Sequence, residues 1–359
     1  MRLAIAKIDL VALSYNLSKT KQLAPHSKVM AVLKANAYGH GLVTIAQHLT
    51  TADAFAVARI DEALALRAGG VTKPIVLLEG FFNKSDLPIL LANNFQTIIH
   101  DENQLAMLES AELDAPIATW LKVDTGMHRL GIEPGQLEGF YRRLKASKNT
   151  HSAVNLMTHF PCADDLKNAR TQNQITAFKQ LTNDHNEQLC LANSAGILGW
   201  TESHCDWIRP GLMIYGVSPM LHCQGVDHGL KPVMRLTTKV IAIRDIPAGE
   251  QVGYGGRWQS NQPTKLAIVA MGYGDGYPRH AKHGTPVVIK GHRYGIVGSV
   301  SMDMITVDIG ENSEQIAVGD EVEMWGPNLA VEEIAECADT IAYELLCNVT
   351  PRVGYQYIS

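Results

Sequence analysis

Residues 32–41 of the chain read VLKANAYGHG, and this stretch decides both the fold and the kind of site that the fold carries. The apolar run 29–33 has the length and composition of a buried parallel strand. Lys34 follows it and precedes a glycine-rich turn, so we expect this lysine at the carboxyl end of a barrel strand, where barrel enzymes place their active sites. A lysine there could bind a phosphate, lie in solvent, or form a Schiff base through a desolvated amine.

From about residue 29 to residue 216, short apolar runs alternate with longer amphipathic segments. This alternation is typical of parallel strands joined by crossover helices. Eight such units predict an N-terminal (β/α)8 barrel of the TIM type, to which we assign residues 1–230. The predicted strands are Val29–Leu33, Ala54–Ala58, Ile75–Glu79, Thr97–His100, Ala118–Asp124, Val154–Phe160, Leu189–Asn193 and Met213–Gly216.

The segments between these strands carry helix signals. Asp61 is expected to cap a helix over 62–68, which the glycine pair 69–70 ends. Asp101 precedes a run of helical periodicity from residue 102 to 111. The local signals therefore agree with the count of strands.

Past about residue 230 the pattern changes to β-rich runs broken by Gly, Pro and Asp turns. These runs predict a second, mostly antiparallel β domain over residues 231–359, with helices near Val331–Ala338 and Ala342–Asn348. Its predicted strands include Leu236–Arg244, Lys265–Met271, Thr285–Ile289 and Met304–Ile309. The predicted fold class is therefore α/β plus β.

Charge and composition exclude several classes of protein. The formal net charge is −5 and the basic residues are dispersed, so we expect no nucleic-acid partner. No apolar run has the length of a membrane span, and charges interrupt the N-terminal residues before a signal-peptide core could form. The six cysteines lie far apart, which predicts reduced thiols in the cytoplasm and no metal site. The glycine-rich string 272–276 is followed by Pro278 and no βαβ unit, so we reject a dinucleotide site.

Short motifs along nearly the whole chain resemble those of the alanine racemases, which are fold-type III pyridoxal-phosphate enzymes. Any one of them could occur by chance, but all of them in this order could not. Besides VLKANAYGHG, the motifs are KVDTGMHRLG at 122–131, THF at 158–160, NSA at 193–195, RPG at 209–211, VGYG at 252–255, GYGDGYPR at 272–279, SMD at 301–303 and YE at 343–344.

The resemblance implies racemisation of alanine by two bases with pyridoxal 5'-phosphate. That cofactor delocalises the charge left when the α-proton is removed, and inversion requires bases on opposite faces of the planar carbon. By resemblance, Lys34 holds the cofactor and serves the α-proton of the D isomer, and Tyr254 serves the L isomer. A phenol is a poor base at neutral pH unless nearby positive charge or hydrogen bonds favour the phenolate. His159, Arg209 and Tyr273 resemble the neighbours that provide this in the family.

The same resemblance implies two binding sites. Arg209 is expected to face the pyridine nitrogen and keep it unprotonated, because a guanidinium does not give up its proton. The cofactor-binding residues are Lys34, Tyr38, Ser194, Arg209, Gly211, Leu212 and Tyr343. Of these, Tyr38, Ser194, Tyr343 and the amides of Gly211 and Leu212 are expected at the phosphate, and Arg209 at the ring. The substrate-binding residues are Arg129, a two-pronged donor for the carboxylate, with Met302, Asp303 and Lys122. Lys122 is often carbamylated in the family, which converts a cation into an anion able to orient Arg129.

Lys34 and Tyr254 fall in different predicted domains. The family brings such residues together in a head-to-tail homodimer, so the resemblance implies a homodimer with shared active sites. One departure is Ser299, which stands where family members usually carry an arginine before the Met-Asp pair.

Alternatives stay open at the level of single residues and of function. His159 could be a core histidine, Tyr254 and Tyr273 could be turn aromatics, and Arg129 could be a surface arginine. The chain could also be a decarboxylase of the same fold type, a non-catalytic pyridoxal-phosphate carrier, or a racemase of serine or another amino acid. Supply of D-alanine for peptidoglycan synthesis is the preferred role over its degradation.

Overall fold

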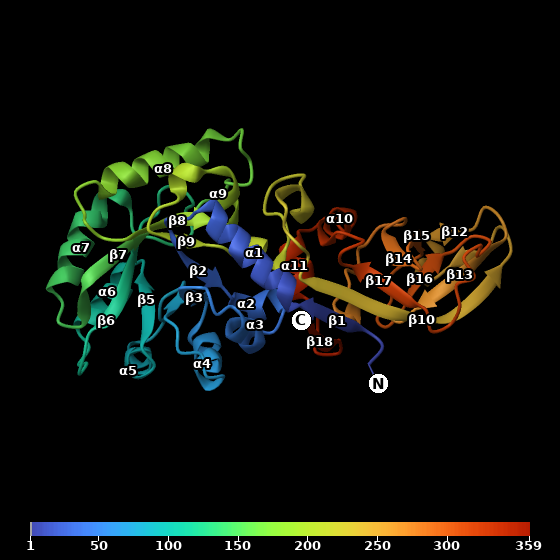
Figure 1. Cartoon of the computed structure of the whole chain (residues 1–359), viewed down its shortest axis with the longest axis horizontal. Helices are drawn as coiled ribbons and strands as arrows, with labels where there is room; N and C mark the ends of the chain where they lie inside the picture. The colour runs from blue at the N-terminus through green and yellow to red at the C-terminus, as the bar shows by residue number, and fades with distance from the viewer. Residues whose placement is uncertain (1) are drawn as a thin grey trace. The chain divides into compact units, whose positions relative to one another are not determined.

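The computed structural model describes residues 2–359, which divide into two compact units. The barrel unit comprises Ser14–Ile214 and Ser218–Cys223. The C-terminal unit comprises the residues up to Leu13, Tyr215–Val217 and Gln224–Ser359. Figure 1 labels the helices and strands of both.

Eight parallel strands close into a ring in the barrel unit, as the alternating pattern predicts. The ring is closed because β2 pairs with β3 on one side and with β9 on the other, where Val29 lies opposite Ile208. The strands are β2 (Lys28–Val32), β3 (Ala54–Val57), β4 (Ile75–Leu77), β5 (Phe95–Ile99), β6 (Ile117–Lys122), β7 (Thr150–Met157), β8 (Leu189–Asn193) and β9 (Trp207–Arg209).

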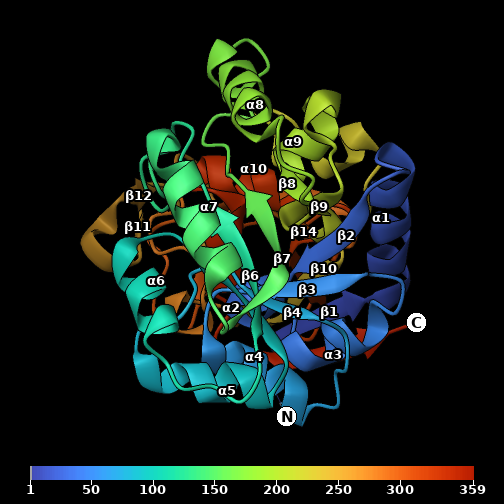
Figure 2. The same cartoon turned by 90° about the vertical axis from the view of Figure 1, so that its left-hand side faces the viewer.

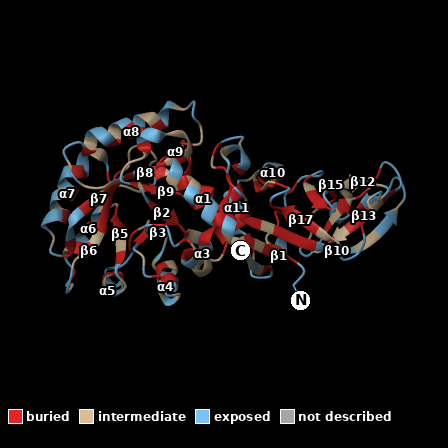
Figure 3. Cartoon of the chain, in the orientation of Figure 1, coloured by how far each residue is buried: buried red, intermediate tan, exposed pale blue. Residues whose placement is uncertain are grey.

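Helices surround these strands, as Figure 2 shows. Both faces of a barrel strand are covered, so β3 and β4 are buried along their whole length. The helices bury one side only: α7 buries Leu137, Phe140 and Leu144 at helical spacing and leaves its other residues exposed or half-buried (Figure 3). The helices are α2 (Lys34–Gly39), α3 (Leu42–His48), α4 (Ile60–Ala68), α5 (Leu87–Ala92), α6 (Glu102–Glu109), α7 (Leu137–Ala146), α8 (Ala169–Thr182) and α9 (Ser194–Gly199), while α1 (Leu10–Leu23) has residues in both units.

The C-terminal unit contains a mostly antiparallel sheet with the strand order β13-β16-β15-β14-β17-β10-β1-β18. The long strand β10 also pairs with β13, and β1 from the start of the chain pairs with β10 and β18. The strands are β1 (Ile5–Asp9), β10 (Met234–Ile246), β13 (Thr264–Val269), β14 (Pro286–Ile289), β15 (His292–Val297), β16 (Ile305–Asp308), β17 (Glu321–Trp325) and β18 (Gly354–Ile358), with a separate hairpin of β11 (Gln251–Val252) and β12 (Trp258–Gln259).

Two helices complete the C-terminal unit, α10 (Val331–Cys337) and α11 (Ala342–Cys347), and both confirm the predicted positions. The sheet core is closed by large side chains such as Trp325 and Tyr277, whose rings stack with centroids 6.2 Å apart. Among residues 2–359, no helix is both long and apolar enough to cross a membrane.

The first seven predicted barrel strands are confirmed, six with shifted ends and Leu189–Asn193 with its predicted ends, but the eighth is wrong. The apolar run at 213–216 is not a strand: Leu212–Tyr215 form a 3-10 turn, and the eighth strand is β9, at Trp207–Arg209. The side chains of 212–215 are apolar because they are buried, not because they pair in a sheet.

Two further expectations concern helix ends and the domain boundary. Asp61 does not cap α4, which begins at Ile60 and has Glu62 as the acceptor for the two amides that precede it. Asp101 caps α6 by accepting from Gln104 at 2.8 Å. The boundary at 230/231 stays a prediction, and the compact units differ from it in placing β1 within the C-terminal sheet.

Gly216 provides a test of the packing of the C-terminal unit. Its φ is +82°, and an added Cβ would lie 1.8 Å from the carbonyl oxygen of Lys231. Gly70, with φ +81° and nothing within 4 Å, is the matched control. We expect Gly70→Ala to cost about 1–2 kcal/mol from its backbone alone and Gly216→Ala at least about 3 kcal/mol, because overpacking is added to the same strain. Thermal melting of both variants measures this, and equal losses would contradict the tight packing.

Candidate functional site

Lys34 begins the short segment α2 directly after β2, and the next four residues adopt a left-handed turn. The φ angles of Ala35, Asn36, Ala37 and Tyr38 are 53°, 56°, 54° and 51°. Left-handed backbone costs L-residues about 1–2 kcal/mol each, and a run of non-glycine residues in this region is rare. Strain of this kind persists where surrounding contacts impose it, and it concentrates at functional sites.

His40 is one source of those contacts. Its Nδ1 lies 2.8 Å from the carbonyl oxygen of Tyr38 and 3.1 Å from that of Ala37, so it donates to both. Burial lowers the pKa of His40 to about 4, although these hydrogen bonds oppose the change. The imidazole therefore stays neutral near neutral pH with its proton on Nδ1. The sequence motif contained His40, but nothing in the sequence pointed to this task.

Arg209, the last residue of β9, is held by groups at the ends of the neighbouring strands. NH1 donates to the carbonyl oxygen and the thiol of Cys190, each at 2.9 Å, and NH2 donates to the carbonyl oxygen of Thr158 at 2.7 Å. NH2 also lies 3.3 Å from Nδ1 of His159 and 3.3 Å from the carbonyl oxygen of Leu191. Within residues 2–359, Nε is the guanidinium nitrogen for which no such contact is found.

His159 lies beside Arg209 and is neutral. Burial, followed by the positive charges of Arg209, Lys122, Arg129 and Lys34, lowers its pKa well below the ordinary value. Because an arginine can only donate, Nδ1 of His159 must accept, which leaves the ring proton on Nε2. The structure therefore brings His159 together with four predicted cationic residues of the site.

Lys122, the last residue of β6, is buried in the same cluster. Burial, then the charges of Arg209 and Arg129, lower its pKa to about 7. Arg129 itself is exposed, in a loop that the carboxylate of Asp124 organises by accepting the amides of Gly126 and Met127, both at 2.8 Å, and of Arg129 at 3.2 Å. Lys122 is thus partly neutral at neutral pH.

Three of the predicted phosphate-binding residues meet at the ends of β2, β8 and β9. Ser194 Oγ accepts the amide of Gly211 at 2.8 Å, so its hydroxyl hydrogen is directed elsewhere. A Cβ at Gly211 would lie 2.5 Å from the Tyr38 hydroxyl oxygen, so only glycine lets that phenol approach. Leu212 follows in the buried 3-10 turn. The amide of Gly211, which the resemblance predicts as a phosphate donor, donates to Ser194 instead.

In the C-terminal unit, Tyr273 and the Met302–Asp303 pair lie on two turns in contact. The Tyr273 amide donates to the Ser301 carbonyl at 3.0 Å and the Gly274 amide to the Met302 carbonyl at 2.9 Å. Arg352, which the sequence analysis missed, joins the same turns through Asp275 at 3.2 Å and Asp303 at 2.6 Å.

Tyr254 lies on a separate turn of the C-terminal unit, where Gly253 and Gly255 both have φ of +75°. Its carbonyl oxygen lies 3.5 Å from the Ser299 hydroxyl, so the residue that departs from the family pattern contacts the turn of the second base. The Tyr254 side chain is 73% exposed, and Tyr273, Met302 and Tyr343 of α11 are exposed too. This unit therefore presents its predicted site residues to solvent.

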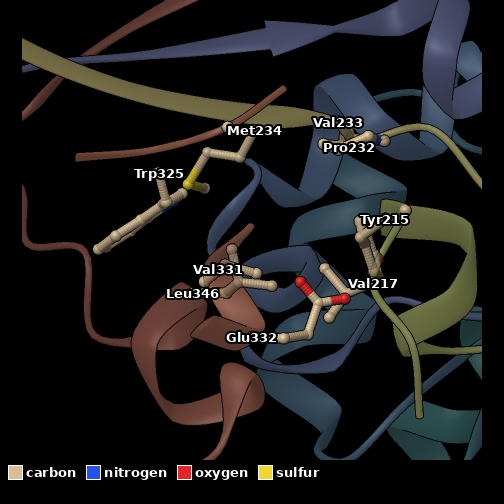
Figure 4. Close-up of a pocket in the computed structure, with 11 residues that line it drawn as sticks. Tyr215, Val217, Pro232, Val233, Met234, Trp325, Val331, Glu332 and Leu346 are labelled. Atoms are coloured by element: carbon tan, nitrogen blue, oxygen red, sulfur yellow. The ribbon is translucent and has the colours of Figure 1, made fainter. Parts of the chain in front are cut away.

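The C-terminal unit also contains a small cavity, shown in Figure 4. It measures about 10 Å³, which is room for one water molecule. Met234, Trp325, Val331 and Leu346 line it together with Glu332, whose carboxylate accepts the Gly225 amide at 2.8 Å. The cavity is too small for an amino acid and contains none of the predicted site residues.

Comparison with known proteins agrees with the fold. The alanine racemase N-terminal domain matches residues 8–219, and the alanine racemase C-terminal domain matches residues 233–357. The chain is 53% identical to the alanine racemase of Vibrio atlanticus over 358 residues, covering 100% of each chain, and 52% identical to that of Aeromonas hydrophila with the same coverage. It is also similar to the crystal structure of the biosynthetic alanine racemase of Pseudomonas aeruginosa, with 41% identity, a TM-score of 0.97 and 100% coverage of each chain. From these full-length matches it follows that the chain belongs to the alanine racemase family.

Proposed function

We propose that this protein is an isomerase that interconverts L-alanine and D-alanine with pyridoxal 5'-phosphate, and that it supplies D-alanine for peptidoglycan synthesis in the cytoplasm. The observation that carries the proposal is the cationic cluster around His159, in which Lys34 stands at the carboxyl end of β2. Such a cluster suits a ligand with a phosphate and a carboxylate group. The alternatives, a decarboxylase, a carrier or a racemase of another amino acid, are not favoured by the full-length likeness to alanine racemases.

The residues present fit the cofactor. Tyr38 and Ser194 would hold its phosphate together with the Leu212 amide. Gly211 admits the Tyr38 hydroxyl, and Ser194, which accepts the Gly211 amide, keeps a hydrogen to donate. Tyr343 would contribute a further hydroxyl. Arg209 would face the pyridine nitrogen through Nε, since its other nitrogens donate to backbone and side-chain groups. When bound, pyridoxal phosphate delocalises the negative charge that develops on the substrate α-carbon.

In this proposal each face of the substrate α-carbon has its own base. Nζ of Lys34 holds the cofactor and, once released, moves the proton of D-alanine. The Tyr254 hydroxyl moves the proton of L-alanine, and neutral His159, Arg209 and Tyr273 would favour its ionised form by hydrogen bonds and charge. Arg129 would bind the substrate carboxylate, with Met302 donating its backbone amide and Asp303 beside it.

We expect Lys34→Ala to lose racemisation in both directions, because the cofactor attachment and one base are removed together. Tyr254→Phe should lower racemisation by roughly 10²- to 10⁴-fold, the usual contribution of one acid–base group. It should still exchange the α-proton of D-alanine with deuterated water, because Lys34 serves that isomer. NMR and optical activity measure the two processes, with serine, lysine and arginine as comparison substrates.

The control for Tyr254→Phe is Tyr294→Phe, which removes a phenol on β15 of the same unit. Equal exchange of D- and L-alanine in Tyr254→Phe would contradict the assignment of one base to each isomer. If the wild type binds the cofactor but does not turn over alanine, the assignment of alanine as the substrate is wrong.

Lys122 is proposed to carry a carbamate that orients Arg129. Its pKa of about 7 leaves much of the amine neutral, and a neutral amine can attack carbon dioxide with loss of one proton. We therefore expect labelling by ¹³C-bicarbonate that increases as the pH rises through about 7. A carbamate NMR signal that is present in the wild type and absent in Lys122→Gln would support this. The same signal in both proteins, or an unmodified Lys122 in the cofactor-loaded enzyme, would count against it.

We also propose a head-to-tail homodimer in which Tyr254 and Met302 complete the partner's site. The exposure of Tyr254 at 73% and Met302 at 52% supports this, because large apolar and aromatic side chains at one site are typical of interfaces. The proposal predicts complementation: mixed dimers of Lys34→Ala and Tyr254→Phe contain one site with both defects and one with neither. Random mixing should then restore about a quarter of wild-type activity.

The control mixes Tyr254→Phe with a chain that carries both Lys34→Ala and Tyr254→Phe, because no pairing of these two chains yields an intact site. Sedimentation measures the oligomeric state in parallel. Mixed dimers without recovered activity, or a fully active monomer, would overturn the shared site.

A further inference from the structure

The left-handed turn after Lys34 is hydrogen-bonded to a side chain from the following βα unit, that of Glu62. Glu62 lies in the first turn of α4, and its Oε1 accepts the amide of Ala35 at 2.6 Å. Its Oε2 accepts the amides of Ala58 at 2.9 Å and Arg59 at 3.2 Å, which precede α4. One carboxylate thus joins the start of α4 to the peptide that links Lys34 to Ala35.

Other contacts of the turn are local in sequence. The Ala37 amide donates to the Leu33 carbonyl at 2.7 Å, the His40 imidazole donates to the carbonyls of Ala37 and Tyr38, and Asn36 Oδ1 accepts the Leu42 amide at 2.9 Å. These contacts lie within residues 33–42 and fix the shape of the turn. Ala35 and Asn36 are exposed, so the start of the turn is held by hydrogen bonds rather than by burial.

We propose that Glu62 is a positioning residue for Lys34: by fixing the Ala35 amide, it sets the direction in which the Lys34 side chain leaves the end of β2. This inference rests on the proposed function only in assigning the cofactor to Lys34. A carboxylate is required because three amide donors share two acceptor oxygens. Glutamine has one such oxygen, so its NH₂ group would face either Ala35 or the start of α4.

Asp86 offers a matched control in the βα unit that follows that of Glu62. It too lies at the third position of a helical turn and accepts two preceding amides, those of Phe82 at 3.1 Å and Asn83 at 3.0 Å. Both acceptor contacts of Asp86 use Oδ2 and stay within its own loop. Comparing Glu62→Gln with Asp86→Asn therefore separates the contact with Ala35 from ordinary capping.

The experiment has one readout without the cofactor and two with it. Hydrogen exchange of the Ala35 amide in the cofactor-free protein reports the contact directly. Attachment of pyridoxal phosphate, in which the Lys34 amine adds to the aldehyde carbon and one water is released, reports the position of Nζ. It is followed by absorbance and by borohydride trapping at Lys34. The kcat and KM for alanine are measured in both directions.

In Glu62→Gln we expect faster exchange at Ala35, attachment slowed by about ten- to a hundred-fold and a lower kcat, because small displacements of a reacting group have effects of this size. Asp86→Asn should keep wild-type values for all three, even where its melting temperature falls. Glu62→Asp, which keeps both oxygens on a shorter chain, should lie between Glu62→Gln and the wild type.

Wild-type exchange and attachment in Glu62→Gln, with a melting temperature lowered as in Asp86→Asn, would overturn the inference and make Glu62 an ordinary cap. Failure of the proposed function is a different result. In that case borohydride would trap no cofactor at Lys34 of the wild type, while the exchange rates at Ala35 would still show whether Glu62 holds the turn.

Discussion

The crowding of cationic side chains at one end of the barrel is the constraint on which the site depends. Lys34, Lys122, Arg129 and Arg209 all act on the charge state of His159. Like charges that lie close together repel one another, and burial adds a desolvation cost for each buried charged group. The barrel creates this situation because every parallel strand ends on the same side.

The structure meets that constraint in three ways. Arg209 keeps its charge and is surrounded by carbonyl oxygens and the Cys190 thiol, whose own pKa is raised by burial so that it remains a neutral partner. His159 is neutral, and Lys122 is close to losing its proton. The charge that remains suits an anionic ligand, since each buried cation still requires a counter-charge or a hydrogen-bond acceptor.

Much of this site could be predicted from the sequence, and the limits have physical causes. The alternating apolar runs predicted the barrel, and the lysine after the first run together with the later motifs predicted the cationic cluster. Both predictions were possible because strand ends are local features of the sequence. The strand β9 was missed since it is three residues long, while the buried run after it looks like a strand. Glu62 was visible only as part of a helix start, because its partner Ala35 lies 27 positions away. No pattern in a single chain signals a hydrogen bond to a backbone amide so distant.

The two units secure their site residues by different means, and the difference bears on how two bases can be used. In the proposed function Lys34 is a base that also holds the cofactor and must return to one position. The strained turn after it is held by Glu62 and His40. Tyr254 and Tyr273 instead lie on exposed turns, and segment 298–304 contacts the backbone of both. Thr350 and Arg352 also hold the Tyr273 turn. A phenol on such a turn has a defined direction but no enclosing pocket of its own within its unit. In the proposed function it would act as a base only where another surface excludes water and supplies positive charge, which is why we propose that a second chain completes the site.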